Sequence, residues 1–73
     1  MPKTIQSSEY KKVVEKLKQA RLEAGLTQKD VSGRINKPQS YVSKVEAGEQ
    51  RVDIIELKIY AELYKKSLNY FIK

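Results

Sequence analysis

Apolar residues in the first third of the chain recur every three or four positions, which is the spacing of one helix face. Ser7 or Ser8 can cap the start of this helix, and Gly25 can supply the left-handed residue that ends it. The pattern predicts a helix over residues 8–24, after a polar and frayed or disordered segment of residues 1–7. The face predicted to enter the core consists of Tyr10, Val13, Val14, Leu17, Ala20 and Ala24.

Helix start and stop signals divide the middle of the chain into two short helices. Thr27, followed three residues later by Asp30, has the form of a shortened capping box, and Asn36 tolerates the left-handed conformation that ends a helix. The next helix is expected to begin at Lys37-Pro38, because proline fits the first turn of a helix. The second short helix is mostly polar and ends at Ala47-Gly48. Apolar core positions are few here: Val31, Ile35, Val42 and Val45.

Two more apolar helices follow. Asp53 and Glu56 form a capping-box pattern at the start of the fourth helix. The pattern breaks at Lys65-Lys66-Ser67, and the fifth helix consists of Leu68–Ile72. No segment shows the alternation of a strand, so the sequence predicts an all-α, compact five-helix domain over residues 8–73. The apolar surface predicted for the fourth helix consists of Ile54, Ile55, Leu57, Ile59, Tyr60 and Leu63, and further aromatic residues at core or interface spacing are Tyr64, Tyr70 and Phe71.

The composition excludes several classes of function. The chain of 73 residues has no Cys and no His, which removes thiolate chemistry, disulfides, the commonest metal ligand and the best proton-transfer group at neutral pH. The helix pattern brings no carboxylates together either, so we expect no enzyme, no cofactor, no metal and no small-molecule ligand. The longest apolar runs have two or three residues and no signal peptide is evident, so we expect a cytoplasmic protein without a membrane partner.

The charge balance is basic. Fifteen Lys and Arg against nine Asp and Glu give a net charge of +6. An excess of this kind on a small domain favours a polyanionic partner, most often nucleic acid. The net charge alone is equally consistent with a lysine-rich surface that is only solvated. The choice between a nucleic-acid partner and a solvated surface therefore depends on where the basic residues lie.

The two short central helices have the pattern of a helix-turn-helix. Ser32 and Gly33 are small enough for a second helix to cross close over the first, and Asn36 permits the tight turn. The outward face of the second short helix has no carboxylate. Its side chains suit base edges, because Gln pairs with adenine, Lys with guanine and Ser with several bases. That face consists of Gln39, Ser40, Ser43, Lys44 and Ala47, with Tyr41 at its margin.

This segment resembles the lambda-repressor/Cro-like helix-turn-helix family, also called the xenobiotic-response-element family. The resemblance rests on Leu-Thr-Gln at residues 26–28 and on Ser-Tyr-Val-Ser-Lys-Val-Glu-Ala-Gly at residues 40–48, and it extends over roughly residues 13–71. Ser32 replaces the usual Ala of the family and Asn36 the usual Gly; both are small or turn-tolerant, so the motif is preserved. Lys37-Pro38 stands in place of the usual polar N-cap.

The resemblance implies roles for individual residues. Gln28 is expected to bind a phosphate and to brace the start of the third helix, and Arg51 is expected to hold a phosphate beside the site. Arg21 and Glu46 match a buried ion pair that ties the first helix to the end of the third. Tyr41 fits packing against its neighbours and contact with DNA equally well. The expected base contacts are Gln39, Ser40 and Lys44, and the expected backbone contacts are Thr27, Gln28, Lys37, Tyr41, Ser43 and Arg51.

The apolar end of the chain suggests a homodimer. Two-fold symmetry would place two recognition helices about 34 Å apart, facing a palindromic operator in double-stranded DNA. The alternative is that the fifth helix closes the core of a single copy. The residues expected in the dimer interface are Leu68, Tyr70, Phe71 and Ile72.

Two functions remain in competition. The first is a small, stand-alone transcription regulator, a repressor or controller protein, that binds a specific DNA sequence at the nucleoid. The second is a protein-interaction module, such as a toxin-neutralising antitoxin, in which DNA binding is secondary or lost. The second function predicts acidic or apolar residues on the outward face of the third helix, and that face carries Gln, Ser and Lys instead.

Overall fold

The computed structural model describes residues 8–72, so the expectation of a frayed segment at residues 1–7 lies outside the described residues. The described chain forms five α-helices and no strand, which confirms the predicted all-α architecture. The radius of gyration of the Cα atoms is 11.3 Å. The helices are α1 (Ser8–Glu23), α2 (Gln28–Ile35), α3 (Gln39–Glu46), α4 (Ile54–Tyr64) and α5 (Leu68–Ile72).

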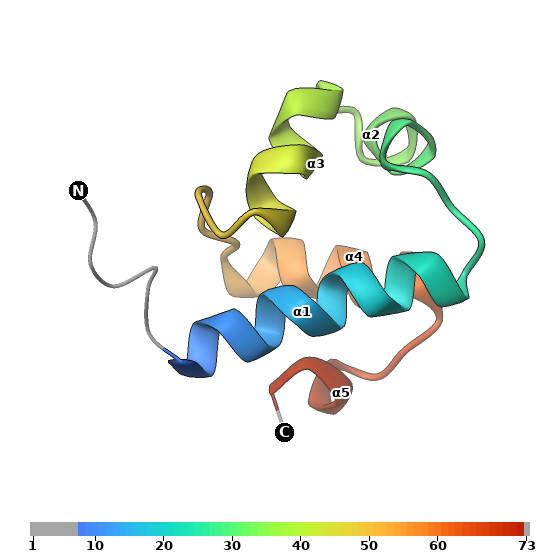
Figure 1. Cartoon of the computed structure of the whole chain (residues 1–73). Helices are drawn as coiled ribbons and strands as arrows, with labels where there is room; N and C mark the ends of the chain where they lie inside the picture. Colours follow the sequence, from blue (N-terminus) through green and yellow to red (C-terminus); the bar gives the residue numbers. More distant parts are fainter. Residues whose placement is uncertain (1–7, 73) are drawn as a thin grey trace.

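The long helix α1 is the centre of the arrangement. It packs against α3, α4 and α5, while α2 packs mainly against α3. In Figure 1, α2 and α3 form the upper part of the molecule, α1 and α4 cross its middle, and α5 lies below α1. The pair α2–α3 therefore stands on one side of α1, and the end of the chain closes the other side.

The core is formed by the inward faces of all five helices. Leu17 and Ala20 of α1 are fully buried, as their helical spacing predicts. Ala24 is exposed, and its predicted place in the core is wrong because α1 ends at Glu23 and Ala24 lies in the turn that follows. The buried apolar residues are Val14, Leu17, Ala20, Val31, Val42, Val45, Leu57, Tyr60, Ala61, Tyr64 and Phe71.

The ends of α2 follow the sequence signals. The Thr27 Oγ1 atom accepts a hydrogen bond from the Asp30 N–H at 3.0 Å, and Asp30 Oδ2 accepts one from the Thr27 N–H at 2.9 Å. This reciprocal pair confirms the predicted capping box. The bond from the Thr27 N–H is the main reason that the pKa of Asp30 is lowered, with the Thr27 hydroxyl next. Asn36 ends the helix in the left-handed conformation, with φ of 60°.

Only part of the apolar surface predicted for α4 enters the core. Ile54, Ile55 and Ile59 belong to that surface and are exposed to 58%, 63% and 46%, so they lie outside the core. The helix carries apolar residues on both sides, and the side with the larger aromatic rings is the one that packs against α1 and α5. The inward face of α4 consists of Leu57, Tyr60, Ala61 and Tyr64.

The short helix α5 closes the core of a single copy. Phe71 is only 1% exposed, so its predicted place in a dimer interface is wrong: its side chain fills the space between α1 and α4. Leu68 and Tyr70 pack partly buried against the same core, and Ile72 is exposed. An ion pair of 2.8 Å between Lys66 and Glu23 holds the preceding turn against the end of α1.

Of the two small residues of α2, Ser32 lies in the packed interior and Gly33 does not. Ser32 is buried, and its hydroxyl donates to the Lys29 carbonyl oxygen at 2.8 Å. Gly33 is exposed, and a Cβ added there would meet nothing within 4 Å, so the close approach expected at Gly33 is wrong.

Replacing Gly33 with alanine is therefore expected to stabilise the protein. Alanine fits without a clash, and it loses less backbone entropy in a helix than glycine. We expect the free energy of unfolding to rise by about 0.5–1 kcal/mol, measured by urea denaturation. A lower stability would mean that the backbone of α2 needs glycine at this position.

Candidate nucleic-acid interface

Helices α2 and α3 form a helix-turn-helix with a tight turn. Asn36 donates its backbone N–H to the Ser32 carbonyl oxygen, and Lys37 donates to the same oxygen at 3.0 Å. The sequence pattern placed Pro38 in the first turn of α3. In the structure Pro38 is the N-cap, with extended backbone, and the helix begins at Gln39. The turn fixes the direction in which α3 leaves α2.

The rotation of α3 is set by two valines. Val42 and Val45 are buried against α1 and α2, which turns the opposite side of the helix to solvent. The predicted outward face is confirmed as exposed, and the first turn of α3 holds no acidic residue. The exposed polar residues on this face are Gln39, Ser40, Ser43 and Lys44.

The start of α3 favours an anion. No side chain caps the helix, so backbone N–H groups of its first turn remain open to an external acceptor. These N–H groups and the helix dipole give the N-terminus a partial positive charge, which suits a phosphate oxygen. Lys37 is exposed directly before this turn and adds a full positive charge.

A buried ion pair holds the other end of α3. Arg21 Nε lies 2.7 Å from Glu46 Oε2, and Arg21 Nη2 donates to Glu46 Oε1 at 3.1 Å. The side chains are 9% and 6% exposed. Arg21 Nη1 also donates to the Leu26 carbonyl oxygen at 2.8 Å, before α2. The ion pair implied by the family resemblance is confirmed, and it joins α1, the α1–α2 turn and the last residue of α3.

Gln28 belongs to the same network. Its Nε2 donates to Glu46 Oε1 at 3.0 Å, so the side chain braces the end of α3 and not the start, and that part of the prediction is wrong. The physical reason is the crossing of the two helices, which brings the first residue of α2 next to the last residue of α3. The contact of Gln28 with a phosphate stays a prediction.

Tyr41 and Thr27 already have partners within the chain. The ring of Tyr41 packs partly buried against the core, and Lys37 Nζ lies 5.2 Å from the ring centroid. Burial raises the pKa of Tyr41, and a hydrogen bond with Glu56 adds to the rise. Thr27 is exposed, with its hydroxyl used in the cap of α2. Packing of Tyr41 is therefore observed, whereas DNA contact by either residue stays a prediction.

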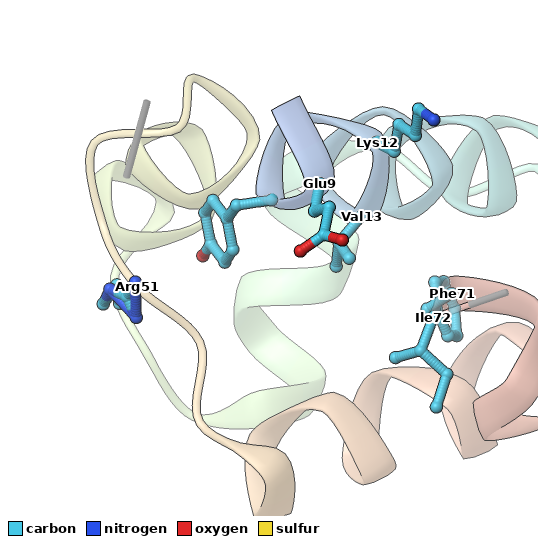
Figure 2. A pocket seen from close by; sticks show the side chains of 7 residues that line it. Glu9, Lys12, Val13, Arg51, Phe71 and Ile72 are labelled. Atoms are coloured by element: carbon cyan, nitrogen blue, oxygen red, sulfur yellow. The ribbon is translucent and has the colours of Figure 1, made fainter. Parts of the chain in front are cut away.

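Arg51 lies in the loop between α3 and α4, and it lines one hollow together with Lys37 and Tyr41 at the start of α3. It is exposed, and its guanidinium carbon is 5.5 Å from the centroid of the Tyr10 ring. Figure 2 shows Arg51 across a second, open hollow from Glu9 and Val13 of α1 and from the end of α5. The residues that line this hollow are Glu9, Tyr10, Lys12, Val13, Arg51, Phe71 and Ile72.

Tyr10 fixes the loop that carries Arg51. Its hydroxyl accepts from the Val52 N–H at 3.0 Å and donates to the Gln50 carbonyl oxygen at 3.2 Å. The sequence pattern identified the apolar ring of Tyr10 and missed this hydroxyl, because nothing in the local sequence links residues about forty positions apart. The structure adds Tyr10 to the residues that position the candidate interface.

Replacing Tyr10 with phenylalanine is expected to keep the ring and loosen the loop. The Val52 N–H then loses its acceptor, and we expect the free energy of unfolding to fall by about 1–2 kcal/mol. Amide hydrogen exchange checks this directly, with faster exchange expected at Val52 than in the wild type. Tyr70→Phe is the matched control, since Tyr70 contacts its neighbours through its ring. Unchanged exchange at Val52 in the Tyr10 variant would contradict the role of the hydroxyl.

Residues 8–72 contain neither a membrane-spanning helix nor a cluster of metal ligands. None of the helices in this range combines the length and the apolar character needed to cross a bilayer. The same residues contain no group of three or more carboxylates that could hold a metal ion.

Comparison with known proteins gives one finding. A family model described as helix-turn-helix matches residues 17–71, from Leu17 in α1 to Phe71 in α5. A search of curated proteins finds no significant match. The matched range contains the whole of α2, α3 and α4 and both partners of the buried ion pair.

Proposed function

We propose that this chain, which belongs to the lambda-repressor/Cro-like helix-turn-helix family of DNA-binding regulators, reads a palindromic operator in double-stranded DNA as a homodimer. In this proposal α3 is the recognition helix and lies in the major groove. The regulator acts at its operator in the cytoplasm, at the nucleoid, by steric repression or by contact with the polymerase.

The observation that carries the proposal is the exposed face of α3. Gln39, Ser40 and Lys44 project from it to solvent, beside one another and without a carboxylate to repel phosphate. Gln can pair bidentately with adenine, Lys can donate to the O6 and N7 atoms of guanine, and Ser can bond to several bases. We therefore assign base contacts to these three residues.

Contacts with the DNA backbone would fix the orientation of α3. The uncapped start of α3 and the exposed Lys37 suit a phosphate on one side, and Arg51 in the α3–α4 loop suits a phosphate on the flank. Phosphate contacts position a protein on DNA and carry no sequence information. The residues proposed for this role are Thr27, Gln28, Lys37, Tyr41, Ser43 and Arg51.

The buried network supports a rigid recognition helix. Glu46 is held by Arg21 and by Gln28, so the last residue of α3 is fixed to both α1 and α2. A side chain that must meet a base edge within hydrogen-bond distance benefits from such preorganisation. The same network explains how an eight-residue helix with two buried valines keeps one orientation.

Selection of binding sites from a random duplex library tests the proposal, followed by a salt titration of the selected duplex. We expect a palindromic site whose half-sites lie about one helical turn apart. We also expect the logarithm of the binding constant to fall linearly with the logarithm of the salt concentration. If no sequence is enriched and only weak, salt-sensitive binding remains, the proposal fails. The alternative, a protein-interaction module such as an antitoxin, would then account for the domain.

A further inference from the structure

Two exposed cations near the start of α3 each lie over the ring of a tyrosine. The ammonium nitrogen of Lys37 is 5.2 Å from the centroid of the Tyr41 ring. The guanidinium carbon of Arg51 is 5.5 Å from the centroid of the Tyr10 ring. Both distances are within the range of about 6 Å over which the face of an aromatic ring attracts a cation. The two cations belong to different parts of the chain, and the same kind of contact holds each of them.

Lys37 and Arg51 line one hollow beside the start of α3. The hollow has a volume of about 460 Å³ and is formed by the turn before α3, the α3–α4 loop and the start of α4. Tyr41 belongs to its lining as well. In the proposed complex the DNA backbone runs past the start of α3, so the cations of this hollow are placed for contact with phosphates.

Carboxylates line the same hollow and are alternative partners for the two cations. Asp53 and Glu56 lie at the start of α4, and Glu9 lies across the second hollow from Arg51 in Figure 2. Within residues 8–72, neither Lys37 nor Arg51 forms an ion pair with any of them. A cation paired with a carboxylate would be neutralised toward DNA. Contact with a tyrosine ring leaves the full positive charge available to a phosphate.

Both tyrosine rings are themselves fixed to the fold. The Tyr10 hydroxyl bonds to two backbone groups of the α3–α4 loop, which is the loop that carries Arg51. Tyr41 packs partly buried against the core, and its hydroxyl donates a hydrogen bond to Glu56 of α4. Each ring therefore offers a fixed surface to a long and flexible basic side chain.

We propose that Tyr10 and Tyr41 are positioning residues for DNA binding, which hold Arg51 and Lys37 in place for contact with the DNA backbone beside α3. The inference rests on the proposed function and names the way in which Tyr41 serves the backbone contact, through its ring and Lys37 and not through its hydroxyl. Lysine and arginine lose much rotamer freedom when they are fixed on binding. A cation already held over a ring has lost part of that freedom before DNA arrives, so less affinity is lost to ordering.

A double-variant cycle of Tyr41 and Lys37 tests the proposal, with fluorescence anisotropy on the selected duplex and on a random duplex. Tyr41→Leu removes the ring, and we expect the dissociation constants of both duplexes to rise about two- to fivefold. In the Lys37→Ala background the same substitution should change them by less than about twofold, because the cation that the ring holds is gone. Equal losses in both backgrounds would mean that Tyr41 does not act through Lys37, and the proposal would be overturned.

The random duplex separates positioning of a cation from a merely structural role. Phosphate contacts carry no sequence information, so loss of the ring should weaken both duplexes alike. A tilt of α3 would weaken the selected duplex more than the random one, because the base contacts of α3 would be lost. A larger loss on the selected duplex therefore contradicts the proposal.

Tyr70→Leu is the matched control. Tyr70 is half-buried like Tyr41, and Lys66 Nζ lies 4.8 Å from the centroid of its ring. This pair lies at α5, on the other side of α1 from α3 in Figure 1. Its loss should leave both dissociation constants unchanged. An effect as large as that of Tyr41→Leu would show that any loss of a packed ring weakens binding, and it would overturn the specific role of Tyr41.

Variants that keep the ring shape protect the test against unfolding, which far-UV circular dichroism detects. Tyr41→Phe retains the ring and should recover most of the affinity that Tyr41→Leu loses. Phenylalanines with successive ring fluorines at position 41 keep the shape and reduce the negative charge on the ring face, so the dissociation constant should rise with each fluorine. A fluorinated tyrosine at position 10 should weaken binding in the wild type and not in Arg51→Ala. Affinities that do not change with fluorination overturn the proposal.

Failure of this inference is distinguishable from failure of the proposed function. If the wild type binds its selected duplex and neither cycle shows coupling, the tyrosines are not positioning residues and the proposed function stands. If the wild type enriches no sequence while the coupling persists on the random duplex, the tyrosines position the two cations and the reading of an operator fails. If the wild type binds neither duplex, both fail.

Discussion

Replacing Glu46 with alanine is expected to lower the free energy of unfolding by about 3–5 kcal/mol. The change leaves the Arg21 guanidinium, which is 9% exposed, without the carboxylate that accepts two of its hydrogen bonds. Gln28 loses its partner as well. A small domain is stable by only about 5–15 kcal/mol, so this single change brings the protein close to unfolding at ordinary temperature.

Urea denaturation followed by circular dichroism measures this effect. The control is Glu23→Ala, which breaks the ion pair with Lys66 at the surface and should leave the unfolding midpoint nearly unchanged. A second variant, Arg21→Met with Glu46→Leu, removes both charges and should recover part of the stability, because no buried charge is stranded. Equal losses for Glu46→Ala and Glu23→Ala would contradict the account of the buried pair.

Replacing Lys44 with alanine is expected to weaken binding to the selected operator by about 1–3 kcal/mol and to relax specificity at one base pair. The reason is that Lys44 is exposed on the outward face of α3, where its ammonium can reach a guanine edge. Fluorescence anisotropy with the operator and with single-base variants measures both effects. The fold should be unaffected, since Lys44 has no role in the core.

Arg51→Ala provides the contrasting result. Because Arg51 lies in the loop beside α3, its loss should weaken binding to all sequences alike and reduce the slope of log affinity against log salt by about one. If the Lys44 and Arg51 variants behave identically on operator and random DNA, the division into base contacts and phosphate contacts is wrong.

The helix boundaries followed from local sequence signals. Thr27 and Asp30 start α2 and Asn36 ends it through bonds and backbone angles that involve only neighbouring residues. Such interactions act over three or four positions, so a single sequence reveals them. The exposed face of α3 followed for a related reason, because two valines three residues apart define its buried side.

Contacts between distant segments were harder to predict. The Arg21–Glu46 pair joins residues twenty-five positions apart and was expected only through the family resemblance. The bond from Gln28 to Glu46 and the bond from Val52 to Tyr10 depend on how the helices cross, which no local pattern encodes. Helix periodicity was also insufficient on α4, where apolar residues occupy both sides and the pattern does not say which side packs.

Titration of the isotope-labelled protein with its selected duplex, followed by amide chemical shifts, tests the central claim most directly. The account predicts that the largest changes fall on α3 from Gln39 to Lys44, at the start of α2 and in the loop at Arg51. The exposed face of α1 around Lys11 and Lys18 should change little. Changes centred on that face of α1, with α3 unaffected, would show that the basic surface binds DNA without a recognition helix and would contradict the account.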